Sequence, residues 1–298
     1  MGVEAGYRSF AYASTLSHIG IPMELGGAGT WLIKRSVDGT DADDAVGPYP
    51  LLCCSDWSSL CGDLAAHDDR FVSVTCVTDP FGAYRLDQLR TAFPALVRPF
   101  KRHLVVDSSR AFADHLPSNH RRNITRAARS VDVEVDIPPD EVADVWTRLY
   151  ENLMGRHRIS GMAAIGPEAL VAQLSVPGAR ISRAVIGSET VAVQVWYLQE
   201  DVAYYHLGAS SDRGYEVGSS FALLDRTLHH LAQQVQWLDL GAGPGLDERS
   251  DDGLTRFKRP WANHSEVAYL CGRVGRPDLY RRLAPGDRPV YFPAYRAP

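Results

Sequence analysis

The chain has 298 residues, of which 45% are hydrophobic and 22% charged, so it is long enough for one large domain or two. This composition excludes a disordered chain, a collagen-like chain and a disulfide scaffold. No apolar run approaches the roughly 20 residues of a membrane helix, and the N-terminus lacks a signal-peptide pattern. We therefore expect a cytoplasmic enzyme without a membrane span.

Charge is distributed unevenly along the chain. The net charge of −5 argues against a DNA-binding protein. Residues 36–69 hold eight Asp and no other charged residue, whereas residues 98–130 hold eight Lys or Arg against two Asp. A basic segment on an acidic protein suits an anionic partner or substrate, and it equally suits a solvated or ion-paired face.

The cysteine and histidine patterns predict no metal. The five cysteines are odd in number and fit no zinc spacing, so we expect buried, reduced thiols. His229 and His230 are adjacent on an expected helix and project about 100° apart. Neither an H-E-x-x-H motif nor the G-x-S-x-G elbow of a serine hydrolase is present.

The first third of the chain gives a sparse α/β pattern. The expected elements are a strand at 31–37, a polar loop at 38–48, a buried strand at 71–77, a helix at 86–93 and a strand at 103–107. Residues 1–30 carry no clear periodicity.

The pattern sharpens after residue 108. We expect a helix over 119–130 with Ser118 as its N-cap, a strand at 131–136, and helices from Pro138 to 154 and over 167–175. Strands at 180–187, 190–199 and 202–208, a helix at 216–234, strands at 236–240 and 265–271 and a helix at 277–284 follow, with a Gly-rich acidic loop at 241–253. Three consecutive strands and one crossover helix predict a mixed sheet with helices on both faces.

Three motifs within about residues 100–265 then resemble the FemXAB-like aminoacyltransferases of the GNAT superfamily. They are N-H-R-R-N-I-T-R-A-A-R at 119–129, Y-Y-H-L-G-A-S at 204–210, and L-D-L-G-A-G at 238–243 followed by G-L-T-R-F-K-R at 253–259. The resemblance implies an α/β protein with two GNAT-like domains, whose mixed, mostly antiparallel sheets are flanked by helices. The expected domains are a degenerate one at 1–107 with the tail from about 271 to 298, and a catalytic one at 108–270.

The resemblance also implies a reaction. Such enzymes transfer an aminoacyl group from aminoacyl-tRNA to an amine of a peptide or nucleotide-linked peptide, as in cell-wall precursors and peptide antibiotics. No resident cofactor is implied. The long helical hairpin that many of these enzymes carry is missing from the sequence, which leaves other donors open.

Lys258 is the first candidate catalytic residue. The chain has three lysines against 28 arginines, so a lysine here suggests a need for a compact charge. The F-K-R match implies that Lys258 stabilises the oxyanion of acyl transfer, with Phe257 fixing it or packing on the substrate. Arg259 completes the match as a candidate substrate-binding residue. The alternative is a surface basic cluster.

The arginine helix supplies candidate substrate-binding residues. Arg122, Arg126 and Arg129 are spaced to share one helix face, which suits phosphate groups of tRNA or of a nucleotide-linked acceptor. Arg121 and Asn123 belong to the same motif. The alternative is pairing of these arginines with the acidic strand at 131–136.

Three further candidates lie on the expected strands. His206 is a candidate general base, Tyr205 a candidate substrate contact, and only one of these neighbours can face a given side of the sheet. Asp239 ends a strand before a Gly-rich loop, where it would orient Lys258 or the substrate amine. Structural roles are the alternative for each, and the resemblance also allows the tRNA itself to carry the amine's proton.

Two other functions remain open from the sequence. Residues 213–219 (R-G-Y-E-V-G-S) resemble a degenerate form of the loop with which CoA-dependent GNAT enzymes bind pyrophosphate, so an acyl-CoA-dependent N-acyltransferase is the first alternative. The second is a non-catalytic relative that binds a peptide or nucleotide.

Overall fold

The computed structural model describes residues 4–110, 116–159, 161, 164–243, 252–284 and 291–297. Most of the expected loop at 241–253 lies outside these residues. The chain divides into two compact units, called here the terminal unit (Tyr7–Lys101 and Val267–Pro298) and the middle unit (Met1–Gly6 and Arg102–Glu266). The boundaries fall inside two long strands, β5 (Leu96–Asp107) and β11 (His264–Val274), whereas we expected them at 107 and 270.

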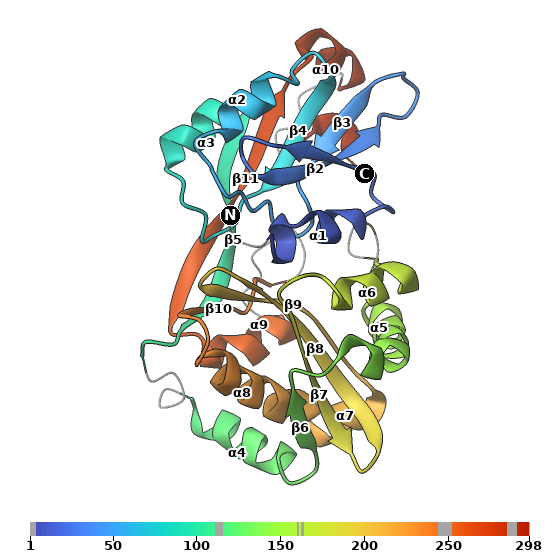
Figure 1. Ribbon diagram of the computed structural model, residues 1–298, viewed down its shortest axis with the longest axis vertical. Helices are drawn as coiled ribbons and strands as arrows, with labels where there is room; N and C mark the ends of the chain where they lie inside the picture. The colour runs from blue at the N-terminus through green and yellow to red at the C-terminus, as the bar shows by residue number, and fades with distance from the viewer. Residues whose placement is uncertain are drawn as a thin grey trace. The chain divides into compact units, whose positions relative to one another are not determined.

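The terminal unit is a mixed sheet with helices packed on it (Figure 1). Its strand order is β1-β2-β3-β4-β11-β5, in which β3 and β4 are parallel. The remaining elements are α1 (Phe10–Ser14), β1 (Ile21–Leu25), β2 (Thr30–Ser36), β3 (Asp43–Val46), α2 (Leu60–Ala65), β4 (Phe71–Val77), α3 (Leu86–Ala92) and α10 (Pro277–Leu283), with short 3-10 turns at Gly6–Arg8 and Ala294–Arg296. The expected elements at 31–37, 71–77, 86–93 and 277–284 are confirmed within a residue or two.

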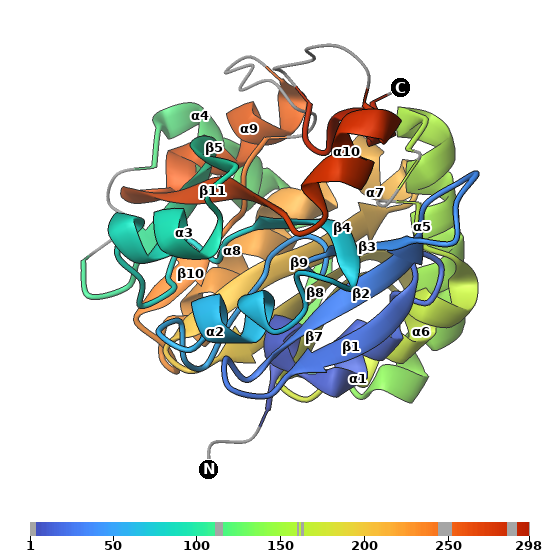
Figure 2. The same ribbon diagram turned by 90° about the horizontal axis from the view of Figure 1, so that it is seen from above.

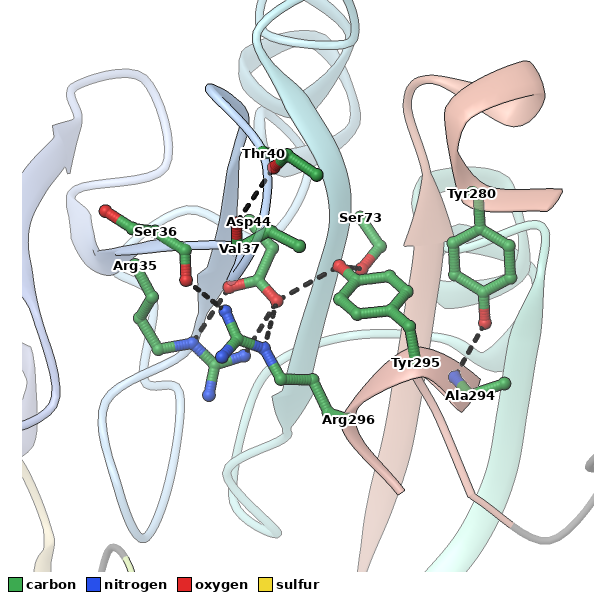
Figure 3. A network of polar contacts seen from close by, with 10 residues as sticks. All are labelled: Arg35, Ser36, Val37, Thr40, Asp44, Ser73, Tyr280, Ala294, Tyr295 and Arg296. Carbon is green, nitrogen blue, oxygen red and sulfur yellow. Dashed lines mark hydrogen bonds and ion pairs between the residues drawn. The ribbon is translucent and has the colours of Figure 1, made fainter. Parts of the chain in front are cut away.

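One expectation for this unit is wrong. The polar segment 38–48 is a loop only in part, because Asp43–Val46 forms strand β3. The acidic residue Asp44 is fully buried there, and its carboxylate accepts hydrogen bonds from Arg35, Tyr295 and Arg296. Figure 3 shows these side chains converging on the carboxylate from two segments, β2 and the 3-10 turn at Ala294–Arg296. The acidic composition of the segment indicated a loop, whereas the segment forms a strand in which arginines from other parts of the sequence neutralise the Asp44 carboxylate.

The middle unit holds strands in the order β5-β10-β9-β8-β7-β6, antiparallel except for the pair β9–β10. Its elements are α4 (Ser118–Ala127), β6 (Asp132–Val135), a 3-10 turn at Pro139–Glu141, α5 (Ala143–His157), α6 (Pro167–Leu174), β7 (Ala179–Ile186), β8 (Glu189–Gln199), β9 (Val202–Ser210), α7 (Asp212–Val217), α8 (Ser219–Leu231), β10 (Trp237–Asp239), α9 (Gly253–Lys258) and a 3-10 turn at Arg259–Trp261. The expected α/β class with a mixed, mostly antiparallel sheet is confirmed.

Helices cover both faces of this sheet (Figure 2). One core packs α8 residues such as Leu224 and Leu228 against Trp196 of β8, Ala203 of β9 and Leu238 of β10. On the other face α5 contacts β8 and β9, and α6 contacts β7. Alternate residues of each strand therefore face the α8 side and the α5 side.

Two details of the middle unit differ from expectation. Ser118 is the first residue of α4, and Pro117 is its N-cap without a side-chain bond, so Ser118 is not the cap. The helix expected over 216–234 is broken at Gly218, whose φ of +69° ends α7 and starts α8. This left-handed conformation is one that glycine adopts without strain. In the described part of the chain, no helix has the length and apolar character to cross a membrane.

Candidate active site

Lys258 lies at the end of β10, held by the short helix α9. Asp252 caps that helix, since its carboxylate accepts hydrogen bonds from the Thr255 backbone N–H and hydroxyl. The Lys258 side chain is only 4% exposed, and its Nζ donates to the Leu240 carbonyl at 2.6 Å. Burial lowers the pKa of Lys258 from 10.5 to about 8, although the carboxylates of Asp239 and Asp252 partly oppose this shift. The group is a buried ammonium at neutral pH.

The aromatic ring of Tyr205 is the second group in contact with the Lys258 ammonium, besides the Leu240 carbonyl. Lys258 Nζ lies 4.0 Å from the ring centroid, within the range of a cation–π interaction. Tyr205 packs edge-on against Trp196, and its hydroxyl lies over Gly208, where an added Cβ would come within 2.0 Å. Gly208 is therefore required for the Tyr205 ring to take this position. Tyr205 and Lys258, both singled out from the sequence, are in direct contact.

Phe257 has a packing role in the observed fold. Its ring lies 5.1 Å from both Phe221 and Trp261, in edge-on arrangements. Its carbonyl oxygen lies 3.1 Å from Nε2 of the buried His120, which links α4 to α9. Phe257 thus fixes α9, the helix that carries Lys258. Arg259, the first residue after this helix, is exposed.

Asp239 faces the side of the sheet opposite to α8, because its neighbour Leu238 faces the α8 core. It is 2% exposed. One carboxylate oxygen lies 2.7 Å from His103 Nδ1 on β5, and the other accepts the Gly241 N–H at 2.7 Å. Sequence reasoning missed His103, because only strand pairing brings β5 beside β10.

His206 also lies away from Lys258, on the α5 side of the sheet. The β8–β9 register slips by one residue there, so His206 forms a β-bulge between Tyr205 and Leu207. Its ring stacks on Tyr197, and its Nε2 lies 3.0 Å from Gln173 on α6. Burial lowers the pKa of His206 to about 3, which keeps the ring neutral but makes it a weak proton acceptor. The structure does not bring His206 and Lys258 together on one face.

The arginine motif occupies the exposed side of α4 and the turn after it. Arg121, Arg122, Arg126 and Arg129 are exposed, and no ion pair to them occurs within the residues that the structure describes. The acidic strand considered as their partner is engaged elsewhere, since Glu134 pairs with Arg183 and Asp136 with Arg180 and His230. Asn123 of the same motif is half-buried.

The segment that resembles a pyrophosphate loop is mostly helical. Residues 212–217 form α7, capped by Ser211, whose hydroxyl accepts the Gly214 N–H. The Tyr215 and Gly218 N–H groups donate to the carbonyls of Ser211 and Tyr215. Three backbone N–H groups of the segment 213–219 are thus bonded within the protein. Arg213 pairs with Glu189.

Comparison with known proteins supports the architecture. Residues 117–259 match the family of acetyltransferase (GNAT) domains. No curated protein matches the chain.

Several solved structures share the fold. FemX is similar with a TM-score of 0.61 and 12% identity over 85% of this chain and 86% of that chain. L-PGS from Bacillus licheniformis is similar with a TM-score of 0.59 and 16% identity, over 93% of this chain and 95% of that chain. A C-terminal domain assigned to a lysylphosphatidylglycerol synthetase from Agrobacterium fabrum is similar with a TM-score of 0.60 and 16% identity, over 90% of this chain and 89% of that chain. Residues 117–259 therefore form a GNAT-type domain, which makes the protein an acyltransferase, and the chain as a whole shares its fold with FemX.

Proposed function

We propose that this acyltransferase moves an aminoacyl group from aminoacyl-tRNA to an amine, forming an amide bond. The acceptor is a peptide or nucleotide-linked peptide of the cell-wall-precursor or peptide-antibiotic kind. The observation that carries the proposal is Lys258, a buried ammonium at the end of β10 in a GNAT-type domain.

The chemistry follows from the position of that ammonium. Attack of an amine on the ester carbonyl of the donor builds negative charge on the carbonyl oxygen. A desolvated cation stabilises this charge far more strongly than a solvated one does. The Leu240 carbonyl and the Tyr205 ring fix Lys258 Nζ before the reaction, so little reorganisation is needed. The activated ester comes with the donor, and the reaction needs no resident cofactor.

Two observations favour aminoacyl-tRNA over acyl-CoA as the donor. In the segment that resembles a pyrophosphate loop, the backbone N–H groups of Gly214, Tyr215 and Gly218 are already bonded within the protein. The four exposed arginines of 121–129, unpaired within the described chain, suit the repeated phosphates of an RNA backbone. Charged tRNA is a cytoplasmic substrate, in line with the location expected from the sequence. The names of the neighbours FemX and lysylphosphatidylglycerol synthetase are consistent with this donor.

The decisive experiment is a donor test. The protein is mixed with bulk tRNA charged with labelled amino acids, and separately with labelled acyl-CoAs, in the presence of a peptide amine. Label should move from tRNA to the peptide faster than the ester hydrolyses. Lys258→Met, which keeps the volume of the side chain, should lower the rate by about 10²- to 10³-fold. Lys34→Met is the matched control, since Lys34 sits in a half-exposed ion pair with Asp43.

The alternatives predict different outcomes. Turnover with acyl-CoA alone would make the chain a CoA-dependent N-acyltransferase. Tight binding of a peptide or nucleotide without turnover of either donor would make it a non-catalytic relative.

A second measurement tests the arginine surface. Joint replacement of Arg122, Arg126 and Arg129 by Ala should weaken tRNA binding and reduce the slope of log K against log salt by up to about 2 to 3. The matched control replaces three exposed arginines of the terminal unit, Arg90, Arg281 and Arg282. Equal losses in both triple variants would remove 122–129 as the tRNA surface.

A further inference from the structure

A histidine that the sequence patterns did not indicate is oriented by a buried carboxylate at the end of β10. His103 is 7% exposed and Asp239 is 2% exposed, with 2.7 Å between His103 Nδ1 and the Asp239 carboxylate. A carboxylate can only accept, so Nδ1 carries the hydrogen and Nε2 is left as the acceptor of the neutral ring. No hydrogen bond to Nε2 occurs in the described part of the chain, and the side chain keeps 9% exposure.

The carboxylate itself is rigidly held. Its second oxygen accepts the Gly241 N–H at 2.7 Å, immediately after β10 ends. The Gly241 carbonyl in turn accepts the Leu104 N–H, one residue from His103. The dyad is therefore tied to the backbone on both strands. Within the described chain, the protein therefore engages one ring nitrogen of His103 and leaves the other without a protein partner.

The dyad borders the position of Lys258. Lys258 Nζ donates to the carbonyl of Leu240, the residue between Asp239 and Gly241. A Cβ built at Gly241 would lie 4.0 Å from that Nζ. His103 and Asp239 reach this strand end from the α5 side, while Lys258 reaches it from α9. The Asp239 carboxylate acts electrostatically on the Lys258 ammonium, so the two groups lie near each other at the strand end 239–241 although their side chains lie on opposite faces of the sheet.

We propose that His103 is the general base of the acyl transfer, and that Asp239 is the residue that positions it. The inference rests on the proposed function. The acceptor nitrogen attacks the ester carbonyl carbon, and a C–N bond forms as the nitrogen's proton passes to His103 Nε2. The tetrahedral intermediate then expels the ribose oxygen of the tRNA, the C–O bond breaks, and His103 returns the proton to that oxygen. The products are an amide and a tRNA with a free ribose hydroxyl.

This role makes the effect of a His103 variant depend on the acceptor. A largely protonated peptide amine needs a base, whereas hydroxylamine is neutral at pH 7 and needs one much less. His103→Gln should therefore slow transfer from charged tRNA to a tripeptide amide about 10²-fold, and transfer to hydroxylamine less than tenfold. His229→Gln, an exposed change on α8, is the matched control and should alter neither rate.

Two further variants separate catalysis from structure. Imidazole in the buffer should restore activity to His103→Ala, because it supplies the missing acceptor. Asp239→Asn keeps the shape of the side chain but favours the tautomer with hydrogen on Nε2, so it should lower kcat more than it changes KM. Circular dichroism and thermal unfolding of each variant report whether it is folded.

The outcomes are distinguishable from failure of the proposed function. Equal losses with both acceptors, no rescue by imidazole, or full activity of His103→Gln would overturn the role of His103 while aminoacyl transfer stands. A wild-type protein that moves no label from any charged tRNA would overturn the donor assignment and this inference together.

Discussion

The terminal unit and the middle unit each hold a charge that is almost fully buried, Asp44 and Lys258, and the two charges are compensated to different extents. In the terminal unit the Asp44 carboxylate accepts from Arg35 at 2.9 and 3.1 Å, from Arg296 at 3.0 Å and from the Tyr295 hydroxyl at 3.0 Å (Figure 3). In the middle unit Lys258 has one carbonyl, one ring face and no direct salt bridge within the described residues. The first charge is compensated by opposite charges, and the second is left short of compensation.

The difference separates a structural charge from a chemically useful one. A buried ion that is fully paired holds segments together, since removing one partner strands the others. A buried ammonium that is weakly compensated can still interact with charge that develops on a substrate. Asp44 and its three partners join β2, β3 and the 3-10 turn at Ala294–Arg296. Lys258, in contrast, lies at the end of β10, where the Asp239 carboxylate is also located.

The largest effect should come from breaking the compensated charge. Asp44→Ala leaves Arg35 and Arg296 half-buried without their carboxylate, and it should lower the free energy of unfolding by about 3 to 5 kcal/mol. Chemical denaturation measures this loss. The matched control, Asp41→Ala, removes an exposed carboxylate three residues away and should cost no more than about 0.5 kcal/mol. Similar losses in the two variants would show that the Asp44 network does not hold the unit together.

The next effect concerns the weakly compensated charge of Lys258 and has a defined pH window. Below about pH 8 Lys258 is protonated in the folded and the unfolded chain, and the folded state bears the cost of burying the charge. Between about pH 8 and 10.5 the folded chain has released a proton that the unfolded chain still binds. The contribution of Lys258 to stability therefore rises with pH across this window, by about 3 kcal/mol in total.

Lys258→Met isolates that contribution, because other groups titrate in the same range. The difference in unfolding free energy between Lys258→Met and wild type should be large at pH 7, in favour of the variant, and should shrink toward pH 10.5. Lys34→Met should show no such trend. A difference that is independent of pH would mean that the pKa of Lys258 is not lowered.

The smallest effect tests the ring beside the ammonium. Tyr205→Leu removes a cation–π contact of about 0.5 to 2 kcal/mol, so the pKa of Lys258 should fall further, by up to about 1.5. Tyr205→Phe keeps the ring face and should leave the pKa near its wild-type value. Lysine side-chain NMR can follow this directly, because the chain has only three lysines. A fall of the same size in both variants would contradict a role for the ring face.

Sequence alone determined the class of fold and most elements of the middle unit. Its strands alternate polar and apolar residues or run apolar for several residues, and its helices carry apolar residues every three to four positions. Such periodicities are local properties that survive without knowledge of neighbours. The motifs at 119–129, 204–210 and 253–259 were likewise sufficient to indicate a GNAT-type acyltransferase. Elements such as β3 and α9 were missed because they have only four and six residues, too few to show a periodicity.

Only the tertiary structure decided which of the candidate residues meet. Strand pairing sets β5 beside β10 and so joins His103 to Asp239, 136 residues apart in the sequence. The alternation of side chains separates His206 from Lys258, and the absence of a Cβ at Gly208 lets Tyr205 lie under the ammonium. Burial, too, is a collective property: it lowers the pKa of Lys258 and hides Asp44, and no local pattern of residues records how many neighbours will exclude the water.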